Sequence, residues 1–190
     1  MDKGRLESFS DGVLAIIITI MVLQLGIPES SEITALYPII PIFLGYVLSF
    51  IYVGIYWNNH HHLLKATHTV SGTILWINLI LLFWISLFPF TTAWMAENLF
   101  TSLPTALYGI VLMMAAISYF ILQRQIIKSE GEESVLSKAL GEKHRGKITL
   151  GLYFIAICVS LILPHVSQLL YFIVALIWLL PDRRIENFLD

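Results

Sequence analysis

Charged and polar residues begin the first apolar stretch of the chain, which runs from Arg5 to Pro28. Arg5, Ser10 and Asp11 lie in its first turns. Residues 6–27, at about 1.5 Å each, are long enough to cross a hydrocarbon core of about 30 Å. Ionisable side chains at membrane depth are costly, so they mark an ion pathway, a proton relay or a buried contact between helices. This stretch is therefore the first candidate for function.

Helical geometry divides this stretch into two faces. At about 100° per residue, Ile16, Thr19 and Leu23 share one face, and Phe9 and Gly12 lie within about 40° of it, with Arg5 close. Asp11 falls about 140° from Ile16, so its carboxylate is expected to face neighbouring helices and to need a buried partner. Candidates for partners of these polar residues, among which the sequence does not choose, are Trp57, Asn58, Asn59, His60, His61, His62, Trp76 and Asn78.

Other chemistry has little support in the sequence. Adjacent histidines on a helix point about 100° apart, and no nearby cysteine or acidic residue completes a metal site around His60, His61, His62 and His68. Polar packing is the favoured role for them, and no metal site is predicted. The sequence has no glycine-rich phosphate loop, HExxH, CxxC or nucleophile elbow, and no span carries a ladder of arginines. We expect neither an enzyme nor a voltage sensor, and no cofactor.

The composition is that of an integral membrane protein. Of the 190 residues, 57% are hydrophobic and 13% charged, whereas soluble domains have about 45–50% apolar and about 25% charged residues. We predict an all-α membrane protein that forms a single six-helix transmembrane domain over residues 1–190. Pro164, near the middle of the last apolar region, favours two short helices there. The expected helices span about 4–27, 38–58, 74–94, 103–123, 148–163 and 166–181, with a cytoplasmic loop at about 124–147.

The placement of charge supports this count of helices. All Lys and Arg residues lie before the first helix, between the second and third, between the fourth and fifth, and after the sixth. The opposite connections contain Glu29, Glu32 and Glu97 and no basic residue. Under the positive-inside rule, this pattern places both termini in the cytoplasm.

Three stretches give the chain a specific resemblance. The RxxxFSDG pattern at Arg5, Phe9, Ser10, Asp11 and Gly12, together with WNNHHHLL at 57–64 and WINLILLFWISLFPFTT at 76–92, resembles the transmembrane protein 175 family. Its animal members are endolysosomal potassium channels with two six-helix repeats, and a single repeat is similar to the prokaryotic members. The TVGYG filter of ordinary potassium channels is absent, as in that family.

The resemblance implies a pore-forming homotetramer in a bacterial or archaeal cell membrane. The first helix would line the pore, with Ile16, Thr19 and Leu23 at an apolar constriction. The signature motif would clamp that helix or gate the pore. An ion that passes such a neck mostly dehydrated implies weak to moderate preference for K⁺ over Na⁺. The partners implied are three further copies of the chain in the homotetramer, membrane lipid, and K⁺ and other monovalent cations, without nucleic acid.

Simpler roles remain open for each residue. Ile16, Thr19 and Leu23 could pack against other helices, Arg5 could be a membrane anchor, and Asp11 with Ser10 could be structural. Two other functions are also consistent with the sequence: a secondary cation transporter, proton-linked through Asp11 or the histidines, and a non-conducting membrane scaffold.

Overall fold

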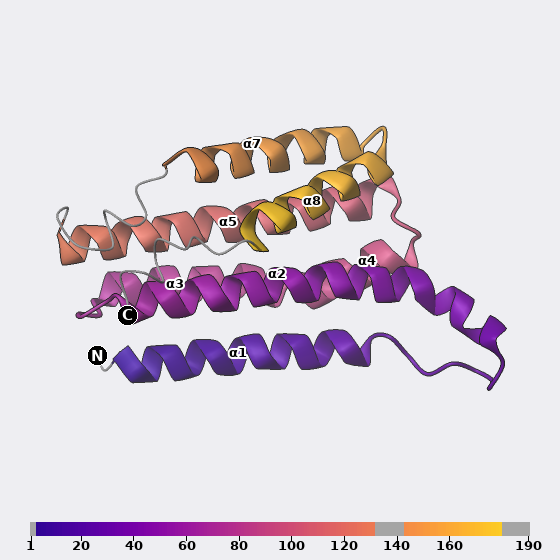
Figure 1. The fold of residues 1–190 in the computed structure, drawn as a ribbon, viewed down its shortest axis with the longest axis horizontal. Coiled ribbons are helices and arrows are strands. Elements are labelled where there is room, and N and C mark those ends of the chain that lie inside the picture. The colour runs from indigo at the N-terminus through magenta and orange to yellow at the C-terminus, as the bar shows by residue number, and fades with distance from the viewer. Residues whose placement is uncertain (1–2, 132–142, 180–190) are drawn as a thin grey trace.

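In the computed structural model, residues 3–131 and 143–179 are described, and all their regular elements are helical. The helices lie nearly side by side along one long axis (Figure 1). They are α1 (Lys3–Leu23), the 3₁₀ helix η1 (Ile33–Ile39), α2 (Ile40–Lys65), α3 (Gly72–Ser86), α4 (Phe88–Glu97), α5 (Ser102–Glu130), α7 (Lys143–Ser160) and α8 (Pro164–Leu179). Together η1 with α2, α3 with α4, and the other four helices form six legs of the bundle.

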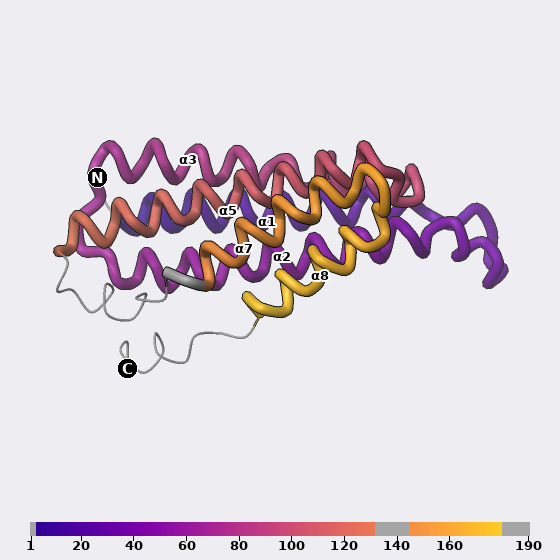
Figure 2. The backbone as a smooth tube through the Cα atoms, turned by 90° about the horizontal axis from the view of Figure 1, so that it is seen from above, coloured from indigo at the N-terminus to yellow at the C-terminus, as the bar shows by residue number. Residues whose placement is uncertain are grey.

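The outermost helices are α1 and α7. α1 packs against α2, α3 and α4 and forms one edge of the bundle in Figure 1, while α7 packs against α5 and α8 at the opposite edge. In Figure 2, α3 lies on one side of the bundle and α2 and α8 lie on the other. The start of α1 and the ends of α2 and α5 lie at the same end of the bundle, which we call the basic end because it carries Lys3, Arg5, Lys65 and Lys128. The end that carries Glu29, Glu32 and Glu97 is called the acidic end.

Helices α1 and α2 end at other residues than the sequence analysis predicts. α1 stops at Leu23 instead of continuing to residue 27, because the chain leaves the helix through turn bonds and reaches Gly26, whose φ of 70° favours glycine. α2 begins at Ile40 after the 3₁₀ turn and continues to Lys65, past the expected end at residue 58. The polar tract at 58–62 is therefore helical, which gives its side chains fixed directions.

The expected third helix over 74–94 is two helices. α3 begins at Gly72, where Ser71 Oγ accepts a hydrogen bond from the backbone N–H of Ile74 at 3.3 Å. It ends at Ser86, and α4 starts at Phe88 with Pro89 in its first turn. Proline has no N–H to donate to the preceding turn, so the regular helix is interrupted there.

The expected loop at 124–147 is shorter than predicted at both ends. α5 continues through residues 124–130 to Glu130, and α7 already begins at Lys143. The middle of that loop lies outside the described residues, as does the expected end of the last helix at 180–181. α7 and α8 form a hairpin in which Pro164 is the first residue of α8.

Hydroxyl groups and close contacts hold the interior together. Ser49 Oγ lies 2.6 Å from Thr92 Oγ1 and 3.0 Å from the Tyr108 hydroxyl, which joins α2, α4 and α5. Gly109 of α5 faces Tyr171 of α8 so closely that a Cβ added to the glycine would collide with the tyrosine hydroxyl. Small residues and hydrogen-bonded hydroxyls are the contacts expected between membrane helices, where burial from lipid adds little.

Candidate functional site

A buried chain of hydrogen bonds fastens α1 to α2 and α3. Asn78 Nδ2 donates to Ser10 Oγ at 3.0 Å, and Asn78 Oδ1 accepts from His60 Nε2 at 2.7 Å. Ser10 Oγ in turn donates to the Leu6 carbonyl at 2.8 Å. The side chains of Ser10, Asn78 and His60 are buried, so their polar groups depend on one another for hydrogen bonds.

Ser10, rather than the expected Asp11, makes the side-chain contact between helices. The Asp11 side chain is half-buried and accepts no hydrogen bond among the described residues. The two residues are about 100° apart on the helix, and Ser10 points into the interior with Leu6 and Leu14. A short hydroxyl fits this packed strip and can be fully hydrogen-bonded there.

A second contact between α1 and α2 lies nearer the basic end. Glu7 Oε1 lies 3.0 Å from His61 Nδ1, and the Trp57 ring stacks on His61 with ring centroids 6.4 Å apart. Glu7 was not among the sequence candidates. It is three residues before Ser10 and so on the same face of the helix, which is the signal that could have identified it.

The remaining candidate partners are exposed or make other contacts. Trp76 is 71% exposed, and Asn59 Nδ2 donates to the Ile55 carbonyl of its own helix. Asn58 is half-buried on α2, and the ring of His62 packs edge-on against His61. Within residues 3–131 and 143–179 we find no group of three or more His, Cys, Asp or Glu side chains that could hold a metal ion.

The opposite face of α1 is bare in the single chain. The side chains of Phe9, Ile16 and Leu23 are 54%, 60% and 75% exposed, and Gly12 and Thr19 are exposed between them. This is the face that helical geometry selected. Thr19 Oγ1 donates its proton to the Ala15 carbonyl at 3.0 Å, which leaves the lone pairs of the hydroxyl oxygen available to a cation. Arg5 is exposed at the start of the same helix.

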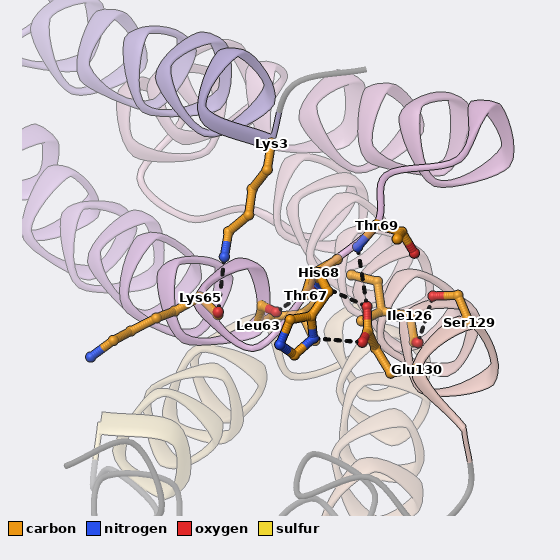
Figure 3. A network of polar contacts seen from close by, with 9 residues as sticks. All are labelled: Lys3, Leu63, Lys65, Thr67, His68, Thr69, Ile126, Ser129 and Glu130. Carbon is orange, nitrogen blue, oxygen red and sulfur yellow. Dashed lines mark hydrogen bonds and ion pairs between the residues drawn. The ribbon is translucent and has the colours of Figure 1, made fainter.

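A brace at the basic end supports the helices that hold α1 (Figure 3). Glu130, the last residue of α5, accepts hydrogen bonds from the backbone N–H groups of His68 and Thr69 at 2.7 and 3.3 Å, and its other oxygen lies 2.8 Å from His68 Nδ1. Lys3 Nζ donates to the Lys65 carbonyl at 2.9 Å. The turn so held joins α2, which carries His60, to α3, which carries Asn78. This brace was not predicted, because Glu130 lies in a tract expected to be a solvated loop.

Comparison with known proteins gives consistent matches. Residues 5–89 match the family model described as endosomal/lysosomal potassium channel TMEM175. A protein of Chryseobacterium sp. (strain P1-3) named as a potassium channel is 54% identical over 187 residues, covering 98% of this chain and 97% of that protein. One of Streptomyces collinus, also named as a potassium channel, is 32% identical over 126 residues, covering 62% of this chain and 61% of that protein.

A solved structure has the same fold. The crystal structure titled as a lysosomal potassium-selective channel TMEM175 homolog from Chamaesiphon minutus matches with a TM-score of 0.83 and 26% identity, covering 95% of this chain and 97% of that chain. Among the described residues, four helical stretches are long and apolar enough to cross a membrane, and α8 is a shorter apolar helix. The prediction of an all-α, multi-pass integral membrane protein with six helical legs is confirmed.

Proposed function

Because this chain belongs to the TMEM175 family, we propose that it is a potassium-permeable cation channel in which copies of α1 from a homotetramer surround the ion path. The observation that carries this proposal is the bare face of α1. This helix buries one strip against its own subunit and leaves Ile16, Thr19 and Leu23 exposed in the single chain. Symmetric assembly around that face would enclose it.

The chemistry of the face suggests how an ion would pass. Ile16 and Leu23 would form apolar rings, between which a ring of Thr19 hydroxyl oxygens could replace part of the hydration shell. K⁺ gives up water more readily than Na⁺, so a narrow neck of this kind favours K⁺. So few oxygen ligands give only weak to moderate selectivity.

The signature motif would hold this helix in place. Ser10 fastens α1 through Asn78 and His60, while Phe9 and Gly12 lie on the proposed pore face and Arg5 stands at its cytoplasmic entrance. We place both termini in the cytoplasm on the positive-inside rule, so that the basic end is the inner end. The role is permeation of K⁺ and related monovalent cations, without a cofactor or an enzymatic step.

Recording from the purified protein in planar bilayers under a K⁺/Na⁺ gradient tests the proposal. Ile16→Asn should hydrate the neck and raise conductance while reducing the K⁺/Na⁺ permeability ratio, and Thr19→Ala should reduce that ratio by removing a ring of oxygens. Ile155→Asn is the matched control, since Ile155 is 52% exposed on α7 at the far edge of the bundle. Unchanged conductance and reversal potential in both α1 variants would remove α1 from the pore. Saturable coupled flux without unitary currents would indicate a transporter.

A further inference from the structure

A groove at the acidic end lies between α1 and the second half of the broken third leg. Its volume is about 410 Å³, within the range of about 300–1,000 Å³ typical of small-molecule sites. Ile20 of α1 and Gln24, the residue that follows α1, form one wall, and Phe90, Trp94 and Glu97 of α4 form the other. None of the contacts that fasten α1 through Ser10 uses these residues.

The wall on α4 presents two aromatic rings. The rings of Phe90 and Trp94 are nearly parallel, at 14°, with centroids 6.2 Å apart. They are four residues apart and so lie one above the other on the helix. The Phe90 side chain is 57% exposed, and Trp94 is half-buried. Aromatic faces of this kind attract a cation placed within about 6 Å of the ring.

The only charge in the lining of the groove is negative. Glu97 is exposed and forms no ion pair among the described residues. The connections at this end, residues 24–39, 98–101 and 161–163, contain no lysine or arginine. The carboxylate is therefore available to a cation from outside the chain, beside the two rings that would receive its apolar part.

We propose that this groove binds an organic ammonium cation. The ammonium group would lie between the Glu97 carboxylate and the Trp94 and Phe90 rings, with Gln24 able to accept a hydrogen bond, and its alkyl substituents would lie against Ile20. A free alkylammonium fits better than the headgroup of a zwitterionic phospholipid, because the phosphate would find no lysine or arginine on the connections at this end.

Binding does not depend on α1 lining a pore, but its consequence would. Ile20 and Gln24 are each next to a residue of the proposed pore face, Thr19 and Leu23. An occupied groove would restrain this end of α1 and so alter the current through a channel of the proposed kind. Binding and conduction are measured separately, so failure of one is distinguishable from failure of the other.

Isothermal titration of the purified full chain in phosphatidylglycerol nanodiscs with choline tests the proposal, with 3,3-dimethylbutan-1-ol as the uncharged analogue of the same shape. Choline should bind saturably and the alcohol should not. Glu97→Gln and Trp94→Leu should each weaken choline binding about tenfold or more, because each removes an attraction for the cation. Phe90→Leu gives a second aromatic variant if Trp94→Leu does not assemble.

Glu29→Gln is the matched control, since it removes one negative charge from the same end but outside the groove. It should leave choline binding unchanged. If Glu29→Gln and Glu97→Gln weakened choline binding equally, the effect would come from general surface charge, and the proposal would be overturned. The proposal would also be overturned if the alcohol bound as tightly as choline. It would be overturned too if choline did not bind at all, which is the result expected if a neighbouring subunit fills the groove. Loss of choline binding in phosphatidylcholine nanodiscs would overturn the preference for a free cation over a lipid headgroup.

Discussion

The Asn78 amide lies between Ser10 and His60, giving a hydrogen bond to one at 3.0 Å and taking one from the other at 2.7 Å. Three helices therefore depend on a single side chain. Replacing Asn78 by leucine leaves buried His60 Nε2 without its acceptor, at a cost of about 1–3 kcal/mol, while Ser10 keeps only its hydrogen bond to the Leu6 carbonyl. We expect Asn78→Leu to lower the midpoint of thermal unfolding of the purified protein clearly.

A double-mutant cycle separates the Ser10–Asn78 hydrogen bond from a general loss of stability. Ser10→Ala combined with Asn78→Leu should cost less than the sum of the two single changes, because the pair then leaves fewer unmatched polar groups. Asn59→Ala is the control, since the Asn59 amide donates only to the Ile55 carbonyl of its own helix. Strict additivity of the two changes would contradict the contact.

Cross-linking tests whether copies of α1 meet at their bare face. In a Cys158→Ser background, Leu23→Cys should form disulfide-linked dimers on mild oxidation, because subunits around a narrow neck bring equivalent Cα atoms near the 4.4–6.8 Å span of a disulfide. Ile155→Cys on α7 should remain monomeric on a non-reducing gel. Equal cross-linking at both positions would indicate random collision.

The Glu130 brace should contribute measurably to stability. Glu130→Ala removes the acceptor for the backbone N–H groups of His68 and Thr69, and we expect a loss of about 1–3 kcal/mol in the free energy of unfolding. Glu130→Gln should lose less, since its amide oxygen can still accept both bonds. Glu29→Ala, an exposed carboxylate at the other end, is the control for lost charge. If alanine and glutamine were equally harmful, the backbone contacts would not be the source of the effect.

The close approach of α5 and α8 predicts a steric effect. A Cβ at Gly109 would collide with the Tyr171 hydroxyl and lie 2.9 Å from Ile157 Cγ1, so Gly109→Ala should destabilise the protein by about 1–3 kcal/mol. Gly151→Ala, where no atom lies within 4 Å of the added Cβ, should be neutral or stabilising. Adding Tyr171→Phe should recover part of the loss at Gly109, as measured by thermal unfolding. If Tyr171→Phe recovered none of the stability lost in Gly109→Ala, the Tyr171 hydroxyl would not be the source of the strain.

Sequence reasoning predicted the helical legs and the two faces of α1, because both follow from hydrophobic length and from rotation of about 100° per residue. It did not predict that Ser10 rather than Asp11 meets Asn78, since both residues point away from the bare face and the choice depends on where α3 lies. It also predicted a single helix over 74–94, whereas the N–H that Pro89 lacks separates α3 from α4.

The remaining differences have a common physical reason. Most of residues 59–65 and 124–130 are polar or charged, so hydropathy assigns them to loops, but packing of their few apolar side chains, such as Leu64 and Ile126, keeps them helical. The Glu130 brace depends on that helical extension, and its bonds go to backbone groups 61 and 62 positions away. No local pattern encodes such a distance.

The division of α1 into a packed strip and a bare strip has a consequence for how such proteins evolve. Ile16, Thr19 and Leu23 lie on the exposed side of α1, so substitutions there leave the buried attachment of the helix through Ser10 unchanged, and natural selection can change them while the scaffold is inherited intact. We expect descendants of one ancestral chain to share the Ser10 attachment and to diverge in the ion they prefer.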